Sequence, residues 1–281
     1  MNTATAAGRA WPAGPRQRLP RVVTPFRTET VSSYIDRLAH ANHLTRGRLQ
    51  YHVAAGTYQT RADWLAVATG IAENILRERL IGFGAANGTN AKQQARVRPA
   101  CRLCMARRGV YEPVHCWLPA YETVCFRHLR WIGPGAATWE DQHDLSNHPD
   151  IVVAARRHRQ LIRAHRDLAG SALSEARHIL TWWSRVNQDS GDDQTDPTTY
   201  LQAYPDLITI ATVLADHRHQ VAAGPCTRHP IWSEHLLGLI NTHATTIRDD
   251  PRPLQHWIDD QRIIARIRPP RHKSAWSAGT V

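Results

Sequence analysis

Three cysteines and one histidine constrain the fold of this chain more than any other feature. Cys101 and Cys104 are followed further along by Cys125 and His128, which makes a C-x2-C…C-x2-H pattern. Each pair can turn tightly and present two donors to one ion, and two pairs complete the closed tetrahedron typical of structural zinc. Four unrelated core side chains are the alternative, but three of the 5 cysteines fall into the pattern. We predict one structural Zn²⁺ site with no open position for chemistry.

The cysteine count also indicates the compartment. An odd number of cysteines in a chain of 281 residues favours an intracellular metal site over a disulfide framework. Residues 1–20 contain arginines but no apolar run long enough for a signal peptide, and nowhere do about 18 apolar residues occur together. We therefore expect a cytoplasmic protein with no membrane association.

The charge favours a polyanionic partner. A formal net charge of +11 and a pI near 10.1 point most simply to nucleic acid, although high arginine usage in a GC-rich genome has the same effect. Basic runs without an acid occupy residues 1–27 and 91–108. A third cluster comprises Arg156, Arg157, Arg159, Arg163 and Arg166. Each run alone could be a solvated face, but three runs around a zinc element favour phosphate contacts.

Helical periodicity runs through most of the chain. Val31, Tyr34, Ile35 and Leu38 repeat at helical spacing, and Thr28 or Thr30 can cap that helix. Leu44, Leu49 and Val53 mark a second helix. We predict a mainly α protein: an N-terminal helix-turn-helix-like module with a zinc ribbon, followed by a C-terminal helical domain.

The helix-turn-helix prediction rests on residues 61–81. Leu65 and Ala66 fit one short helix and Ile71 and Leu76 another, with Gly70 at the turn, where positive φ is needed. Glu73, Asn74, Arg77 and Glu78 would then face outwards. Asn74 and Arg77 suit base edges or phosphates, whereas the two glutamates would repel phosphates. A purely structural helix pair is the alternative reading.

Together these patterns give a set of candidate nucleic-acid contacts. They are Asn74, Arg77, Arg98, Arg102, Arg107, Arg156, Arg159 and Arg163.

Between the two ligand pairs, Tyr121, Thr123 and Val124 alternate into Cys125. This alternation predicts a short hairpin between the pairs, as in a zinc ribbon.

Three segments within residues 24–132 follow one another in this order: TETVSSYIDRLAHANHLTRGRL, LAVATGIAENILRERL and RPACRLCMARRGVYEPVHCWLPAYETVCFRHLRWI. Together they resemble the TniQ family of transposition target-selection proteins. The family's SxxSxxxRLAxxN helix is matched by Ser33, Arg37, Leu38, Ala39 and Asn42. The C-x-x-C, Leu-Pro and C-x-x-H elements follow, with Arg102 where the family usually has proline.

The resemblance implies an adaptor in transposition. Such a protein selects or is brought to a target site on DNA and recruits the AAA+ ATPase transposition regulator; in RNA-guided relatives it bridges a crRNA-effector complex to that ATPase. The chain itself has no G-x-x-x-x-G-K-[ST] phosphate loop and no recognisable carboxylate constellation. We therefore expect a non-enzymatic protein.

The second half predicts a helical docking scaffold. A helix over 174–186 carries Ile179, Leu180, Trp182 and Trp183, which we assign to the core in preference to base stacking. Residues 187–199 hold four aspartates and read as a loop. Further helices are expected at 200–214 with a break at Pro205, at 231–247 and at 253–267.

These segments suggest four parts. A basic flexible N-terminus covers 1–24, the helix-turn-helix and zinc ribbon module 25–135, a helical domain 136–267, and a flexible tail 268–281. A homodimer is compatible with this arrangement but nothing in the sequence requires it.

Other readings compete with the adaptor. His217, His219, Cys226 and His229 could close a second zinc site, although His-x-His is a less typical ligand pair. His143, Asn147 and His148 superficially suggest a metal-dependent nuclease, but they lack a paired ligand at helical spacing, so a plain loop is the better reading. A zinc-ribbon helix-turn-helix transcription regulator is the main alternative, and it would need a dimer and a palindromic site.

Overall fold

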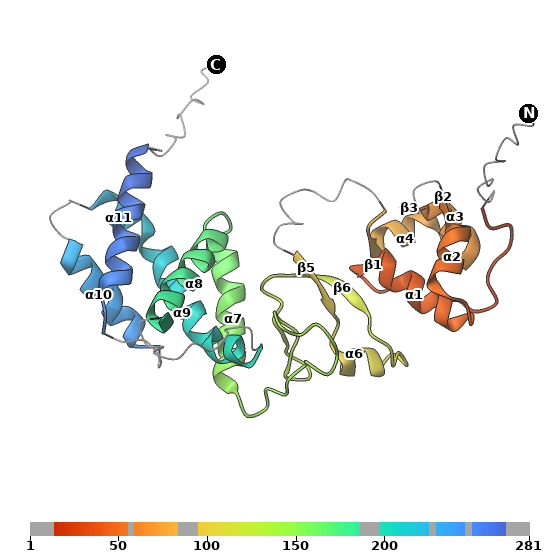
Figure 1. Ribbon diagram of the computed structural model, residues 1–281, viewed down its shortest axis with the longest axis horizontal. Helices are drawn as coiled ribbons and strands as arrows, with labels where there is room; N and C mark the ends of the chain where they lie inside the picture. Colours follow the sequence, from red (N-terminus) through yellow and green to blue (C-terminus); the bar gives the residue numbers. More distant parts are fainter. Residues whose placement is uncertain are drawn as a thin grey trace, which may run out of the picture. The chain divides into compact units, whose positions relative to one another are not determined.

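The fold was analysed in a computed structural model that describes residues 14–55, 59–83, 95–185, 197–224, 229–244 and 249–267. The chain divides into two compact units, Met1–Ser146 and Asn147–Val281, called unit 1 and unit 2 below. Helices are the main regular structure of the described chain, most of all in unit 2, which confirms the mainly α prediction at that level (Figure 1). Within the described ranges, no helix is long and apolar enough to cross a bilayer.

Four short helices open unit 1. They are α1 (Val31–Ala41), α2 (Arg46–Val53), α3 (Ala62–Thr69) and α4 (Glu73–Arg79). Their apolar faces share one core, in which Tyr34, Leu38, Leu65 and Leu76 are completely buried. The periodic residues that predicted these helices are therefore the ones that hold them together.

The first helix begins as the sequence indicated. Thr30 is the N-cap, and its hydroxyl accepts a hydrogen bond of 3.0 Å from the Ser33 amide. Thr28, the other candidate cap, instead adopts a left-handed conformation with φ of 65°. Of the two threonines, Thr30 alone satisfies a free amide of the first turn.

The turn between α3 and α4 is made by Gly70. Its φ is 68°, and its amide donates to the Ala66 carbonyl over 2.7 Å, which closes the end of α3. Leu76 lies inside, as predicted, and Ile71 is partly buried against the same core. Two short helices around a left-handed glycine are therefore present at the predicted positions.

A four-stranded sheet joins these helices to the cysteine-rich segment. Its strand order is β4 (Leu80–Ile81), β1 (Glu29–Thr30), β6 (His115–Pro119) and β5 (Ala95–Pro99). β1 runs parallel to β4 and antiparallel to β6, with Glu29 opposite Cys116. The two residues of β1 thus connect the helical core to the strands that flank the first ligand pair.

Two further pairs of strands complete unit 1. β2 (Ala54–Ala55) pairs with β3 (Gln59–Thr60), and β7 (Val124–Cys125) pairs with β8 (Arg130–Trp131), both antiparallel.

The predicted hairpin between the two ligand pairs is wrong. β6, which follows the first pair, runs back along β5, and β7, which leads into the second pair, is closed by β8. Each ligand pair is therefore flanked by two strands that pair with each other. The physical reason is that β6 is paired on both of its edges, with β1 and β5, so β7 takes β8 as its partner.

The boundary between the units lies later than residue 135, where the sequence suggested it. The segment 136–146 belongs to unit 1. The indole of Trp139 donates to the Ala100 carbonyl over 3.0 Å, and the amide group of Gln142 donates to the same carbonyl over 3.0 Å. These long-range bonds attach the segment to the first ligand pair.

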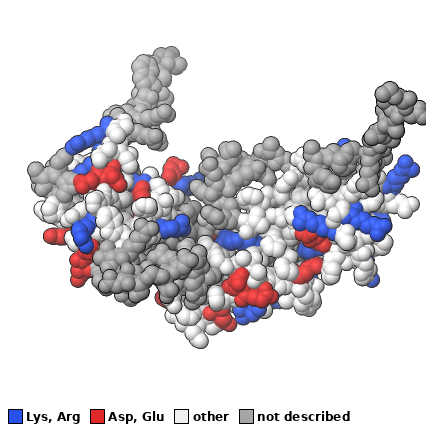
Figure 2. All heavy atoms as spheres, in the orientation of Figure 1, with Lys and Arg blue, Asp and Glu red and all other residues white. Residues whose placement is uncertain are grey.

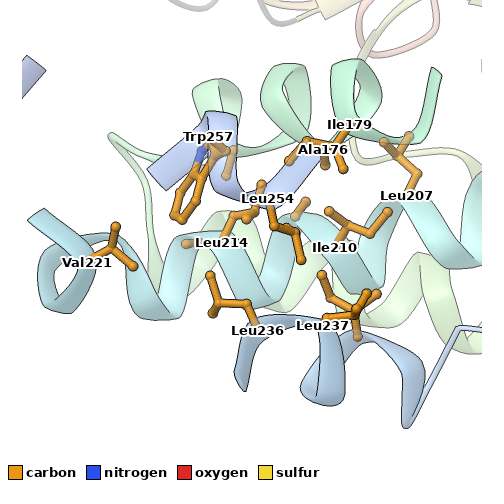
Figure 3. Close-up of a cluster of buried hydrophobic side chains, with 14 of the residues drawn as sticks. Ala176, Ile179, Leu207, Ile210, Leu214, Val221, Leu236, Leu237, Leu254 and Trp257 are labelled. Atoms are coloured by element: carbon orange, nitrogen blue, oxygen red, sulfur yellow. The ribbon is translucent and has the colours of Figure 1, made fainter. Parts of the chain in front are cut away.

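Unit 2 is a helical bundle built around one long helix. Its elements are α7 (Pro149–Ala164), α8 (Ala169–Arg185), α9 (Pro197–Ala223), α10 (His229–Asn241) and α11 (Arg252–Ile267). Leu207, Ile210 and Leu214 of α9 point into the centre of the core, where Leu236 of α10 and Leu254 of α11 meet them (Figure 3).

The structure corrects three predicted bounds in unit 2. The expected break at Pro205 is absent, because α9 continues through it while burying apolar side chains on both sides; this packing offsets the backbone hydrogen bond that proline cannot donate. Of the predicted acidic loop, 187–196 lies outside the described residues and 197–199 begin α9. The next helix ends at Asn241, and residues 245–248 are outside the description.

The two neighbouring tryptophans of α8 differ in burial and in their contacts. Trp183 is buried, and its indole donates to the Asp250 carbonyl over 2.9 Å. Trp182 is 38% exposed and stacks on His256 with ring centroids 4.8 Å apart. The core assignment is right for Ile179 and Trp183 and wrong for Trp182, because consecutive helical residues point about 100° apart.

Candidate metal centre

The four predicted ligands meet at one point of unit 1. The Sγ atoms of Cys101, Cys104 and Cys125 and a ring nitrogen of His128 lie within 4.8 Å of one another. The Nδ1 atom of His128 lies 3.3 Å from Cys104, 3.6 Å from Cys101 and 3.7 Å from Cys125. Cys104 and Cys125 are separated by 3.6 Å between their sulfurs. In the described ranges, no second group of this kind gathers.

These separations fit the edges of a coordination tetrahedron. An ion with bonds of about 2.3 Å to sulfur and about 2.0 Å to nitrogen has sulfur–sulfur edges of about 3.8 Å and sulfur–nitrogen edges of about 3.5 Å. The four donors are thus spaced to hold one metal ion among them. All four positions of a tetrahedral site would be filled by protein, so no position remains for a substrate.

Local backbone turns position both ligand pairs. Cys101 precedes the short helix α6 (Arg102–Ala106), and its carbonyl accepts from the Met105 amide over 3.1 Å. The second pair lies between β7 and β8, where the His128 amide donates to the Cys125 carbonyl over 3.2 Å. Leu129 follows with φ of 46°, which turns the chain into β8. Each C-x2 spacing is therefore one closed turn.

The thiols share protons in a way that suits a cation. A hydrogen bond from Cys101 lowers the pKa of Cys125 to about 4, against the opposing effect of burial. The same bond, together with burial, raises the pKa of Cys101. Burial, and then the charge of Cys125, raises the pKa of Cys104. One thiolate is therefore stabilised by its neighbours' protons, and a bound cation would take the place of those protons.

Gln142 holds the first ligand pair from outside. Its side-chain carbonyl accepts from the Arg102 amide over 2.9 Å, and its amide group donates to the carbonyls of Pro99 and Ala100. Arg130 in turn donates to the Gln142 backbone carbonyl over 2.8 Å. Gln142 was not predicted from the sequence, because a side chain that bonds only to distant backbone groups has no characteristic spacing to other residues.

A small apolar cluster packs beside the ligands. Phe26, Met105, Val114 and Cys116 are buried together, and Cys104 packs against them. Cys116 is the fourth described cysteine, and it belongs to this cluster rather than to the ligand set. The site thus has a dry side, which would shield metal–sulfur bonds from water if an ion were bound.

The helix motif on which the family resemblance rests surrounds a buried carboxylate. Glu29 is fully buried and accepts from Arg37 Nη1 at 2.8 and 2.9 Å, from the Ser33 hydroxyl at 3.2 Å and from the Phe26 amide at 2.9 Å. Ser33 Oγ also accepts from the His115 amide of β6 over 2.9 Å. Ser33 and Arg37 therefore tie α1 to the sheet whose strands β5 and β6 flank the first ligand pair. Glu29 was not singled out from the sequence.

Asn42 plays a comparable role at the other end of α1. Its side chain accepts from the Arg21 amide over 3.0 Å and donates to the carbonyls of Arg21 and Leu38 over 2.7 and 2.8 Å. The segment before β1 is thereby fastened across the helix. These motif residues have structural roles in this chain.

The candidate nucleic-acid contacts differ in exposure. Asn74, Arg77, Arg107, Arg156 and Arg163 are exposed, whereas Arg102 and Arg159 are partly buried. Arg77 also forms an ion pair of 2.7 Å with Glu73 one turn earlier. In Figure 2, lysine and arginine side chains gather over the N-terminal helices of unit 1, with acidic groups beside them.

Arg98 corrects the set. It is 6% exposed, and its Nη2 donates to the carbonyls of Pro119 and Leu118 at 2.9 and 3.4 Å. Its guanidinium stabilises the β5–β6 edge from inside and is not available to a phosphate. The alternation of a β strand explains this, because a residue within a basic run can still face inwards.

The other histidine-rich places do not form ligand groups among the described residues. His217 packs edge-on against His235 and contacts Gln220, while Cys226 lies outside the described ranges and so does the side chain of His229. His143 and His148 are exposed and belong to no metal-ligand group within the description.

A scan against protein-family models, a search of curated proteins and a search of solved structures each gave no match to this chain. The description of the fold and the site therefore rests on the residues of this chain alone.

Proposed function

We propose that this chain is a non-enzymatic, DNA-associated adaptor of transposition, of the TniQ kind, that recruits an AAA+ ATPase regulator. The observation that carries the proposal is the link between motif and metal centre. Ser33 and Arg37 hold Glu29, and Glu29 lies opposite Cys116 in the sheet next to the first ligand pair. The motif helix and the cysteine cluster are parts of one structural unit, which supports a resemblance to the TniQ family that covers both.

Zinc is the metal that this donor set suits best. Three thiolates and one imidazole in a closed tetrahedron are typical of structural zinc, and the donor separations agree with its bond lengths. The residues that would hold it are Cys101, Cys104, Cys125 and His128. Bound there, zinc would stabilise the connection between β5, β6 and β8 and supply no reaction step.

Association with DNA would use exposed arginines. Arg156 and Arg163 lie on the exposed face of α7, and Arg107 lies beyond α6. A guanidinium on a solvated helix face can approach the phosphate backbone without desolvating another charge. The adaptor would therefore hold DNA through contacts with phosphates. It would bring the ATPase to the target site by binding both the DNA and the ATPase.

A helix-turn-helix regulator is the second candidate. The pair α3 and α4 around Gly70 supports it, since Asn74 is exposed on α4. Arg77, however, is paired with Glu73, and exposed Glu78 would repel a phosphate. This reading requires a protein dimer on a palindromic site.

A pull-down distinguishes the candidates. The purified chain is tested against the AAA+ ATPase encoded beside its gene, with and without target DNA, and its zinc content is measured on the same sample. Cys104→Ser is expected to lose the metal and the retention of the ATPase. Cys116→Ala is the matched control, because Cys116 is buried nearby but is not a ligand.

Retention of the ATPase by a protein with one zinc per chain supports the adaptor. A zinc-loaded protein that ignores the ATPase but binds one palindromic DNA sequence as a dimer would establish the regulator instead. Equal metal loading of Cys104→Ser and wild type would show that the proposed ligand set is wrong.

A further inference from the structure

A basic cleft lies on unit 1, and none of the four candidate metal ligands lines it. Its volume is about 710 Å³. Four segments line it: residues 23–27 before β1, Arg37 of α1, the end of α4, and the residues that follow α6. The cleft therefore exists only when the helical core and the metal-bearing part of unit 1 are assembled.

Arginines dominate the wall of this cleft. Arg27, Arg79 and Arg108 line it and are exposed, and none of them forms an ion pair with a residue that the structure describes. Arg37 also lines the cleft, but its charge is balanced by Glu29. Glu78 is the acid among the described lining residues. Three free cations against one carboxylate leave the cleft with a net positive charge.

Two of these arginines are held in place. Arg79 Nη1 donates to the Pro25 carbonyl over 3.2 Å, which leaves its other N–H groups without a described partner. The Arg108 guanidinium lies over the Phe26 ring, 5.3 Å from its centroid, and the Arg37 guanidinium is 4.6 Å from the same centroid. A guanidinium that is already held in place loses less conformational entropy when it binds an anion, so less of the binding free energy is spent on ordering it.

We propose that this cleft binds the phosphodiester backbone of DNA. The planar donor groups of Arg27, Arg79 and Arg108 match phosphate oxygens, and the cleft is large enough for more than a single phosphate group. The proposal rests on the DNA association proposed above, and it assigns one site that brings together Arg27 and Arg108, from the ends of two basic runs, with Arg79, which lies in neither run. The contact reads backbone charge and carries no base sequence.

Salt dependence of DNA binding tests the cleft. Fluorescence anisotropy of a labelled duplex is measured over a series of NaCl concentrations for the full chain and for Arg27→Gln with Arg108→Gln. Loss of two phosphate contacts is expected to reduce the slope of log K against log salt by about 1.8, at about 0.9 per contact. The single change Arg27→Gln, which breaks no hydrogen bond or ion pair with a described residue, should reduce it by about 0.9.

The matched control is Arg16→Gln with Arg48→Gln. Both arginines are exposed and neither lines the cleft, so the protein loses the same charge elsewhere on unit 1. This control should keep the wild-type slope. A second assay measures the shift in melting temperature caused by pyrophosphate, which shows whether the cleft prefers a small free phosphate compound.

Four results overturn the proposal. A wild-type slope in Arg27→Gln, or an equal loss of slope in the control, excludes a specific role for the cleft; retention of the ATPase would then leave the adaptor function standing. Stabilisation by pyrophosphate that disappears in Arg27→Gln, with an unchanged DNA slope, identifies a small-molecule site instead. A wild-type protein that binds no DNA at any salt removes both the cleft proposal and the DNA association.

Discussion

Arg37 Nη1 lies 2.8 Å and 2.9 Å from the two carboxylate oxygens of Glu29, and both side chains are almost completely shielded from water. Glu29 is on β1 and Arg37 is on α1, so this ion pair fixes the first helix on the sheet. Burial raises the pKa of Glu29 more than the neighbouring guanidinium lowers it. The ion pair therefore fixes the position of α1 on the sheet, and burying its two charges costs desolvation free energy.

Removing one partner of this pair should be severe. Arg37→Met leaves the Glu29 carboxylate buried without its cation, and we expect the free energy of unfolding of unit 1 to fall by about 3–5 kcal/mol. Arg46→Met is the control, because Arg46 and Asp36 form an exposed pair, whose loss should cost about 0–1 kcal/mol. Urea unfolding followed by circular dichroism measures both.

The double change Glu29→Met with Arg37→Met separates charge from shape. It removes the unpaired carboxylate as well, so it should be more stable than Arg37→Met alone. A double variant as unstable as the single one would show that packing, not the ion pair, dominates.

Asn42→Ala should loosen the segment before β1. The change removes three hydrogen bonds to backbone groups of Arg21 and Leu38, and we expect a loss of about 1–3 kcal/mol in the free energy of unfolding. Asn74→Ala, on the exposed face of α4, should change stability by less than about 0.5 kcal/mol. Equal effects at both positions would contradict the role given to Asn42.

Gly70→Ala should destabilise the turn between α3 and α4. An added Cβ would lie 3.0 Å from Arg18 Cδ, and a φ of 68° costs an L residue about 1–2 kcal/mol. Gly47→Ala is the matched control, because a Cβ there meets nothing within 4 Å and replaces a flexible residue in α2. That control should gain about 0.5–1 kcal/mol. Thermal melts that shift both variants in the same direction would refute this account.

Cys116 should behave as an unreactive thiol in the folded protein. Burial, with the charge of Glu29 adding to it, raises its pKa to about 12 from an ordinary 9.0. Because the folded state holds this proton more tightly, the thiol's contribution to stability is complete below pH 9.0 and is lost as the pH rises towards 12. Unfolding of wild type and Cys116→Ala, compared on both sides of pH 9.0, measures that loss.

Alkylation followed by mass spectrometry gives an independent reading. Iodoacetamide should modify Cys116 readily in the unfolded chain and scarcely at all in the folded protein at neutral pH. Rapid modification under native conditions would mean that the thiol is more accessible than its burial indicates.

The sequence predicted the metal ligands because their information is local. Each C-x2 pair fits within one turn, so spacing alone indicates two donors on one side, and Gly70 and Thr30 are local signals of the same kind. The joining of the two pairs is not local. It depends on strand pairing. The alternating run near Cys125 predicted a hairpin between the two ligand pairs, but β7 pairs with β8 instead.

Residues recognised by their tertiary contacts escaped prediction. Gln142 and Glu29 bond to groups brought near by folding, and neither belongs to a short motif of metal or base recognition. The break expected at Pro205 failed for the opposite reason, because a strong local signal was outweighed by packing along α9. Arg98 shows that net charge does not say which way a side chain points.

The position of β1 has a consequence for the order in which the protein is made. β1 leaves the ribosome before α1 to α4, whereas its neighbour β6 and the last ligand His128 follow much later. The four helices can pack as they are synthesised, but Glu29 has strands on both sides only after Cys116 has emerged. Sheet closure and assembly of the four-residue Cys/His group are therefore late steps, so a nascent chain that stalls before His128 would carry a folded helical core with an incomplete group.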